Sequence, residues 1–133
     1  MKAPLLLCAT VLLACLTACN SPQRYTRNRQ AGEQWLSGKT GTARINLTGA
    51  WHSDDWGNAI FVQGQNRVNG QISSYTAYGR VSGSKAYILI SQHGWIYYTA
   101  ELSMPNKNEL TGSYSKSVGF QSLRQKVIHF RRQ

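Results

Sequence analysis

The stretch INLTGAWHSDDWG, residues 45–57, brings a histidine, two adjacent aspartates and two tryptophans together. Glycosidase carboxylates must flank one bond at a set separation, but neighbouring Asp54 and Asp55 point to opposite sides of an extended chain. His52 with an aspartate is a weak metal-binding pattern without a second cluster of ligands. Aspartates and Gly57 are good turn residues, because Asx side chains cap the backbone and glycine adopts positive φ. We therefore predict a turn between two strands, with catalysis, metal binding or a ligand gate as weaker alternatives.

No other part of the chain supplies a catalytic pattern. The histidines His52, His93 and His129 are scattered, and only five residues are acidic. The sequence holds no Gly-x-Ser-x-Gly elbow, no glycine-rich phosphate loop and no H-E-x-x-H motif. It therefore predicts a protein that is not an enzyme and that uses no metal and no cofactor.

The chain begins with MKAPLLLCATVLLACLTACN, where one lysine precedes an apolar run over 4–16. The run is too short to span a bilayer and is typical of a secretory signal peptide. At the end of this segment, LTAC at 16–19 resembles a bacterial lipobox, in which signal peptidase cuts before a diacylated cysteine. The resemblance implies a signal peptide over 1–18 and a lipid on Cys19. An ordinary signal peptide cleaved near Ala18 is the alternative.

The cysteine inventory favours lipidation, because Cys8, Cys15 and Cys19 are the only cysteines in the chain. Cleavage before Cys19 would leave one thiol, which the lipid would consume, so the fold must depend on core packing without a disulfide. The acyl chains would hold the protein on a membrane. Asn20 resembles the sorting pattern of enteric lipoproteins destined for the outer membrane. We therefore expect a cell-envelope protein on the outer membrane, facing the periplasm.

Basic residues dominate, with a formal net charge of +10. In an exported lipoprotein this charge favours an anionic lipid or cell-wall surface, or an acidic envelope protein, over nucleic acid. The alternative interpretation, that the charge only keeps the protein soluble, has equal weight. Residues 20–44 show no apolar period and contain Glu33 as their one acid. Their composition predicts that residues 19–44 form a flexible basic tether.

From residue 46 onward, short alternating segments are separated by turn residues. Such spacing, with β-branched and aromatic enrichment, predicts an all-β domain over 45–133. Tight turns favour an eight-stranded antiparallel up-and-down barrel, because closure removes the exposed edges of the sheet. Eight strands leave an interior that side chains fill or that holds one small ligand. The expected strands are 46–51, 58–63, 67–73, 77–82, 85–91, 94–102, 109–115 and 120–131.

A repeat supports the barrel, since the form apolar, small polar, glycine occurs at 47–49, 68–70, 81–83 and 110–112. Alternate strand residues share a face, so the aliphatic residue, the glycine and a following aromatic, Trp51 or Tyr114, point the same way. Inward glycines let strands bend and let rings lie over the backbone, as a small closed barrel requires.

The segment LTGAW at 47–51 resembles the Gly-x-Trp signature on the first strand of lipocalins and the opening of avidin-like barrels. In lipocalins the tryptophan closes one end of the barrel and an arginine from the last strand packs over it. The resemblance implies structural roles for Gly49 and Trp51, with Arg124 or Arg131 in cation–π contact with the ring. The domain is shorter than a typical lipocalin, and the residues with which avidins bind biotin cannot be placed, so no ligand is implied.

Aromatic residues cluster in the middle third of the chain, where exposed rings beside cations resemble a contact patch for a protein or glycan. Rings that merely cover a thin barrel wall are the alternative. Broken alternation between Val127 and Ile128 predicts a β-bulge. In 94–102, alternation predicts a core face of Ile96, Tyr98, Ala100 and Leu102. The candidate partner-binding residues are Trp51, Trp56, Tyr78, Tyr87, Trp95 and Tyr97.

Two functions stay open at this point. The first is a lipid-anchored, non-catalytic interaction module for an envelope protein or a glycan. The second is a lipocalin-like carrier or sensor of a small apolar ligand, and a hydrolase at the 52–57 corner is a third, weaker hypothesis. A filled core favours the first, and we expect one because so small a barrel has little interior volume. The expected core residues are Leu47, Trp51, Ile60, Val68, Ile72, Leu89, Ile96, Tyr98, Leu110 and Tyr114.

Overall fold

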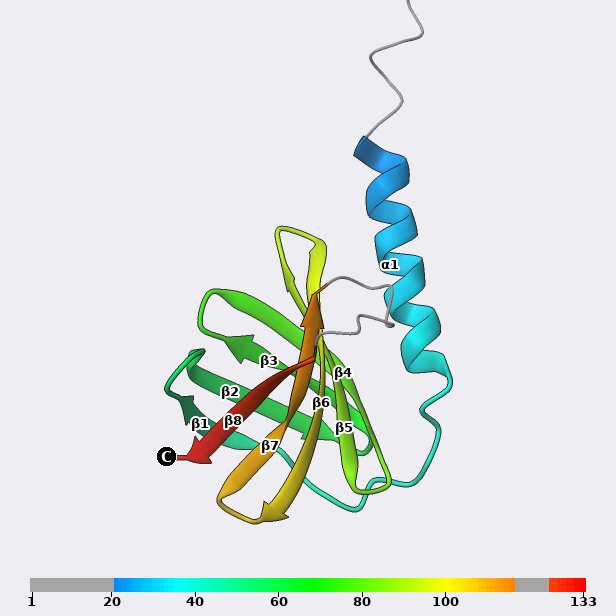
Figure 1. Ribbon diagram of the computed structural model, residues 1–133. Coiled ribbons are helices and arrows are strands. Elements are labelled where there is room, and N and C mark those ends of the chain that lie inside the picture. Colours follow the sequence, from blue (N-terminus) through cyan, green and yellow to red (C-terminus); the bar gives the residue numbers. More distant parts are fainter. Residues whose placement is uncertain (1–20, 117–124) are drawn as a thin grey trace, which may run out of the picture.

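A computed structural model describes residues 21–116 and 125–133. Within these ranges the chain forms a closed barrel of antiparallel strands in sequence order, with β8 pairing to β1, preceded by one helix (Figure 1). The predicted eight-stranded up-and-down barrel is confirmed. The signal peptide, Cys19 and the first part of the predicted strand 120–131 lie outside the described residues. The elements are α1 (Ser21–Ser37), β1 (Gly49–Ser53), β2 (Gly57–Gly64), β3 (Arg67–Ile72), β4 (Tyr75–Ser82), β5 (Lys85–Gln92), β6 (Trp95–Asn106), β7 (Glu109–Lys116) and β8 (Lys126–Arg132).

Side chains fill the interior of the barrel. Trp51, Phe61 and Phe130 are fully buried, and the two phenylalanine rings meet edge to face with centroids 6.2 Å apart. The prediction that Ile60 belongs to the core is wrong, because β2 turns Phe61 inward and leaves Ile60 58% exposed. The buried interior set is Leu47, Trp51, Ala59, Phe61, Val68, Ile72, Ala77, Val81, Ala86, Ile88, Ile90, Ala100, Leu102, Leu110, Ile128 and Phe130.

Inward-facing glycines let neighbouring strands approach closely. A Cβ atom on Gly70 would overlap the carbonyl group of Ile60, and one on Gly112 would overlap that of Glu101. Leu110 and Tyr114 lie on the same interior side as Gly112, as the repeat predicted. Strand curvature in this small barrel therefore requires the absence of a side chain at these positions.

A second apolar cluster lies on the outside of the barrel, between α1 and the strands β5 and β6. It contains Leu36, Leu89 and Ile96, all buried. Leu89 and Ile96 were predicted to be core residues, and they are buried, but against the helix rather than inside the barrel. The β5–β6 register shifts between Ile90 and Ser91, and this shift turns Ile96 outward although Tyr98, two residues later, packs on the interior cluster.

The predicted bulge between Val127 and Ile128 is wrong. β7 and β8 keep one register along their whole pairing. Val127 faces solvent with 75% of its surface exposed, whereas Ile128 is buried in the core. The exposed Val127 beside the buried Ile128 therefore explains why the sequence pattern resembled a break in alternation.

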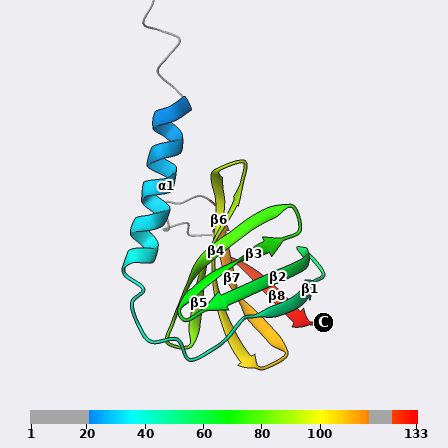
Figure 2. The same cartoon turned by 180° about the vertical axis from the view of Figure 1, so that it is seen from behind.

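The prediction of a flexible tether over 19–44 is wrong for residues 21–37, which form α1. Pro22 suits the first turn of a helix, and Gly38 directly follows the last helical residue. Figure 1 and Figure 2 show α1 running along the outside of the barrel beside β4, β5 and β6. Gly32 faces Leu89 and Ile96, so the helix comes close to the sheet. Neither α1 nor any other described segment is a helix long and apolar enough to cross a membrane.

Asn28 fixes the helix on the barrel through the backbone of Ile96. Its Nδ2 donates to the Ile96 carbonyl at 3.1 Å, and the Ile96 amide donates to its Oδ1 at 2.8 Å. Ile96 lies beyond the last β6–β7 pair, which joins Tyr98 to Lys116. The buried amide of Asn28 thus takes the place of a neighbouring strand and satisfies polar groups that would otherwise be costly to bury.

Residues 38–48 form a strap that crosses the end of the barrel opposite the β5–β6 hairpin. Ala43 bridges to Gly83 in the β4–β5 turn, and two backbone hydrogen bonds flank this bridge. The side chain of Gln63 holds the strap from the other side, accepting from the Leu47 amide and donating to the Ile45 carbonyl. The strap therefore closes this end of the barrel.

The close approach at the inward glycines predicts a strong asymmetry between two alanine substitutions. Gly79→Ala places a Cβ against the Tyr87 carbonyl and should lower the free energy of unfolding by about 3 kcal/mol. Gly64→Ala, which has open space around it, should change it by less than about 0.5 kcal/mol. Chemical denaturation of both variants measures the difference, and equal stabilities would contradict the role of Gly79.

The Asn28 contact predicts a local effect at one backbone amide. Asn28→Ala removes both hydrogen bonds to Ile96 and should weaken helix docking by about 2 kcal/mol. The Ile96 amide should then exchange its hydrogen with solvent much faster, as read by NMR. Gln30→Ala on the exposed side of α1 is the matched control, and unchanged protection of Ile96 in Asn28→Ala would refute the assignment.

Candidate functional site

The strap end of the barrel is closed around Trp51. The indole Nε1 donates to the Leu47 carbonyl at 2.8 Å, and the guanidinium carbon of Arg132 lies 4.2 Å from the centroid of the Trp51 ring. Arg132 also donates from Nη1 to the Thr48 carbonyl at 2.9 Å and from Nε to the Lys107 carbonyl at 2.7 Å. This arginine joins β1, β8 and the β6–β7 turn, so the tryptophan has a structural role here.

The arginine that covers Trp51 was predicted to be Arg124 or Arg131, and that choice is corrected to Arg132. Arg131 points the other way along β8 and lies 3.7 Å from Asp54, while Arg124 is outside the described residues. Gly49, with φ of 142°, leaves the space that the Arg132 guanidinium occupies. Gly49 therefore has a structural role, because a side chain at this position would take the space of the Arg132 guanidinium.

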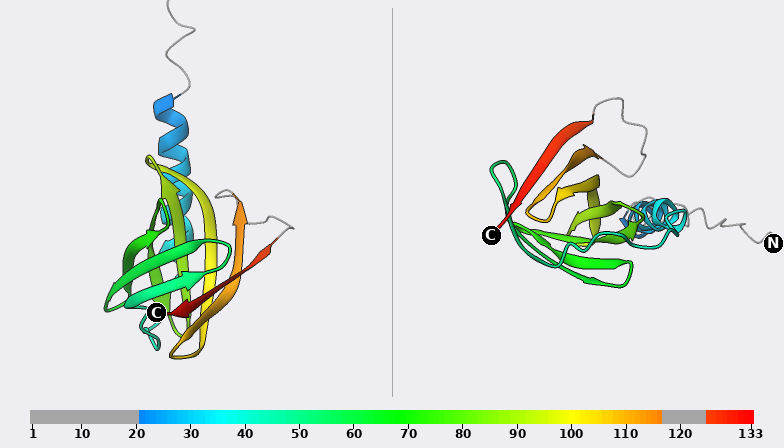
Figure 3. Two further views of the ribbon diagram at one scale, coloured as in Figure 1. Left: turned by 90° about the vertical axis from the view of Figure 1, so that its left-hand side faces the viewer. Right: turned by 90° about the horizontal axis from the view of Figure 1, so that it is seen from below.

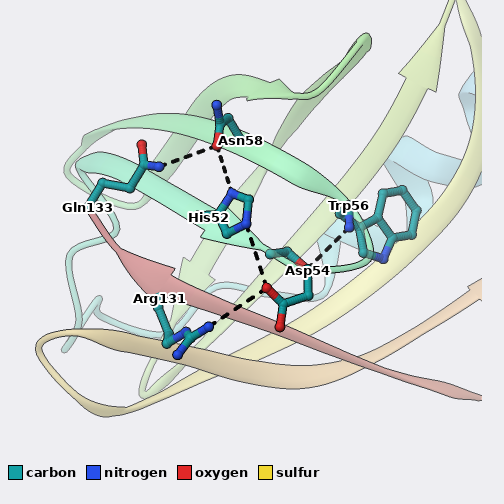
Figure 4. A network of polar contacts seen from close by, with 7 residues as sticks. His52, Asp54, Trp56, Asn58, Arg131 and Gln133 are labelled. Carbon is teal, nitrogen blue, oxygen red and sulfur yellow. Dashed lines mark hydrogen bonds and ion pairs between the residues drawn. The ribbon is translucent and has the colours of Figure 1, made fainter.

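The corner at residues 52–57 is a turn, as predicted. Figure 4 shows His52 beside Asn58, with a ring nitrogen 2.8 Å from the amide oxygen, and Asp54 between His52 and Arg131 at 3.7 Å from each. Gly57 has φ of 81°, as the turn requires. Asp54 is 81% exposed, so its contacts are weak, solvated ion pairs. Among the described residues no group of three metal-ligating side chains forms.

The opposite end of the barrel is built from aromatic rings, and we call it the aromatic end: Trp56, Tyr75, Tyr97, Tyr98 and Tyr114. Trp56 from the β1–β2 turn lies at its centre, with its ring centroid 4.9 Å from Tyr114, 5.2 Å from Tyr98 and 5.9 Å from Tyr75. The contacts are edge to face, which is a favoured arrangement for aromatic pairs. Trp56 thus covers the interior core from this end.

Two rings of the aromatic end extend its surface toward solvent. Tyr97 is 43% exposed, and its ring centroid lies 6.4 Å from that of half-buried Tyr75. Burial, followed by the neighbouring Tyr98, raises the pKa of the Tyr75 hydroxyl. The hydroxyl therefore stays protonated at neutral pH and can both donate and accept hydrogen bonds. An exposed face of this kind combines apolar ring surface with polar tips.

The six candidate partner-binding residues are divided among three places. Trp51 is buried in the core, and Trp56 and Tyr97 belong to the aromatic end. Tyr78, Tyr87 and Trp95 lie on the outer face under α1. There Tyr87 meets Trp35, and Trp95 meets Tyr25. Most of the outer aromatic set therefore binds the chain's own helix.

Sequence reasoning assigned Tyr98 and Tyr114 to the core and left Tyr75 in a turn, so it missed their part in the aromatic end. All three lie at strand ends, close to the turns that meet at this end of the barrel. Antiparallel strands bring alternate turns to one end, and aromatic residues beside those turns could have indicated a shared cluster. What the sequence could not give is the register that brings the rings into contact.

Within the described residues, the fold is a small, closed β-barrel with one helix packed on its outer face. No protein-family model, no curated protein and no solved structure matches the chain.

The closed end predicts different consequences for two neighbouring arginines. Arg132→Ala removes the cation–π contact and two charge-assisted hydrogen bonds, and should lower the free energy of unfolding by about 2 kcal/mol. Arg131→Ala removes only an exposed pair with Asp54 and should cost less than about 0.5 kcal/mol. Urea denaturation followed by tryptophan fluorescence compares them, and a larger loss for Arg131→Ala would contradict the placement of Arg132.

Proposed function

We propose that the protein is a lipid-anchored, non-catalytic binding module of the bacterial cell envelope, and that the aromatic end binds its partner. The observation that carries this proposal is the cluster of tyrosine rings over a barrel filled by side chains, in which Tyr97 is 43% exposed and the other rings are partly buried. Rigid aromatic rings with polar tips are the residues that dominate protein contact surfaces. The partner is an envelope protein or a glycan.

The filled interior favours this proposal over a carrier of a small apolar ligand. A carrier needs volume inside the barrel, and ligand pockets of this kind are generally several hundred Å³. Here Trp51, Phe61, Phe130 and the aliphatic residues around them take up the interior, each 2% exposed or less. A hollow of about 160 Å³ is lined by described residues of α1, β3 and β4. It lies outside the barrel, so it adds no volume to the interior.

The lipid anchor in the proposal is supported by the sequence alone. The LTAC segment at 16–19, the absence of cysteine after Cys19 and the short apolar leader all fit a lipoprotein of the outer membrane. The net charge of +10 fits partners or surfaces with negative charge. We propose no hydrolase at the 52–57 corner, because Asp54 is 81% exposed and lies 3.7 Å from both His52 and Arg131 in solvated contacts.

The anchor is tested by labelling with radioactive palmitate. The wild-type chain should take up the label and Cys19→Ser should not, with Cys15→Ser, which should still be labelled, as the matched control. Equal labelling of the wild type and Cys19→Ser would overturn the lipid anchor.

The binding surface is tested by site-specific photo-crosslinking in intact cells. A photo-reactive residue replacing Tyr97 should form a discrete covalent adduct with an envelope protein, or with isolated cell-wall polymer. The same residue replacing Lys107, in the turn at the closed end, should do neither. Identical behaviour at the two positions would refute the aromatic end as the binding surface.

A further inference from the structure

Docking of α1 determines how the barrel is held relative to the proposed anchor. Asn28 and Leu36 fix the helix on the outside of the barrel. Cys19 precedes Ser21 by two residues, a link of about 7 Å when extended. From Ser21 to Tyr25 the helix adds about 6 Å at its usual rise. The distance along the chain from residue 19 to the docked helix is therefore short.

The part of the barrel nearest the anchor is the β5–β6 hairpin. Figure 1 and the left view of Figure 3 place this hairpin beside the N-terminal half of α1. The Tyr25 and Trp95 ring centroids are 5.4 Å apart, and the Arg24 guanidinium carbon lies 5.9 Å from the Trp95 centroid. Tyr25 remains 42% exposed. We call this surface, formed by Arg24, Tyr25 and Trp95, the hairpin edge. Arg27 lies on the neighbouring face of the first turns of α1, beside Gln23 and Gln30, and His93 lies in the β5–β6 turn.

The chemistry of the hairpin edge matches a membrane interface. Tryptophan and tyrosine concentrate at the level of lipid headgroups, because their rings are apolar at one side and polar at the other. Arg24 and Arg27 lie in the first turns of α1, which carries no acidic residue in its first turn. The helix N-terminus adds positive partial charge. Cations close to a bilayer are attracted by anionic headgroups.

The acidic residues are placed away from this edge. Asp54 and Asp55 lie in the β1–β2 turn, which Figure 3 (right view) shows on the side of the barrel away from α1. Glu33 lies nearer the other end of the helix, where it lines the groove between α1 and β4 together with Arg80. The hairpin edge is therefore basic, although positive charge is not confined to it, because Arg44, Lys85, Lys107 and Arg132 lie at the closed end.

We infer that the hairpin edge lies against the anionic headgroups of the membrane that holds Cys19. This inference rests on the proposed function, because it takes Cys19 as the anchor. The turns β1–β2, β3–β4 and β5–β6 lie at one end of the barrel, so the aromatic end is held on the membrane side, with Asp54 and Asp55 on the part of this end that is farthest from α1. Its partner would then be a molecule displayed at the membrane surface, not one in the bulk of the compartment.

Two isosteric cysteine substitutions at opposite ends of the barrel test the orientation. Ser74→Cys lies in the β3–β4 turn beside the hairpin, where Gln92 contacts Ser74, and Ser84→Cys lies in the β4–β5 turn at the closed end. Each full chain is purified from membranes, labelled with a fluorophore and reconstituted into vesicles of zwitterionic and anionic phospholipid carrying a headgroup-linked quencher. We expect severalfold stronger quenching at position 74 than at position 84.

Charge variants test the attraction itself. Arg24→Gln with Arg27→Gln should reduce the quenching at position 74, as should vesicles without anionic lipid. The matched pair Arg44→Gln with Lys107→Gln, at the opposite end, should leave it unchanged. Equal quenching at the two labelled positions, or a loss that is the same for both charge pairs, overturns the inference.

The mass of the N-terminal peptide from the same samples separates the two proposals. An acylated Cys19 with equal quenching at both positions overturns the orientation and leaves the lipid anchor standing. An unacylated Cys19 overturns the anchor. In that case the orientation fails together with the anchor on which it rests.

Discussion

Closure of a small sheet around its own side chains is the constraint on which the rest of the structure depends. Neighbouring strands approach so closely at Gly70, Gly79 and Gly112 that a Cβ atom at any of them would overlap a backbone carbonyl. The interior that remains is occupied by Trp51, Phe61 and the residues around them, without a disulfide in the described domain. Close packing of this kind stabilises the barrel but leaves its outer surface and its ends to carry function.

The two ends of the barrel therefore differ in chemistry. One end is closed by the strap and by Arg132, which lies over Trp51. This contact joins β8, the last strand, to β1, the first strand. The other presents a cluster of rings around Trp56 with tyrosine hydroxyls at its surface. α1 covers a third surface, the outer side of β5 and β6, and turns aromatic residues that would otherwise be exposed into an intramolecular contact. In our proposals α1 connects the membrane anchor to the barrel that carries the partner-binding end.

Strand alternation and turn residues were enough to predict the closed barrel, the turn between β1 and β2, and the inward positions of Gly70 and Gly112. The repeat did not include Gly79, and it included Gly83, which lies in the β4–β5 turn with φ of 62°. They failed where several apolar residues are consecutive, as at Ile60 and Phe61, because either phase of alternation is then acceptable. The shift between Ile90 and Ser91 depends on pairing between two strands, and it decides that Ile96 faces α1. α1 itself was missed because its apolar stripe is narrow, and one of its main contacts is made by a polar residue, Asn28. The covering arginine was predicted one position away, because its place depends on the β1–β8 register.

Native mass spectrometry of the intact protein, extracted gently from membranes, tests most directly whether the barrel is filled by its own side chains. The mass should equal that of the processed polypeptide with its acyl chains, and it should not change when the protein is unfolded. An additional apolar molecule that is present in the folded protein and lost on unfolding would contradict a filled interior and would favour a carrier.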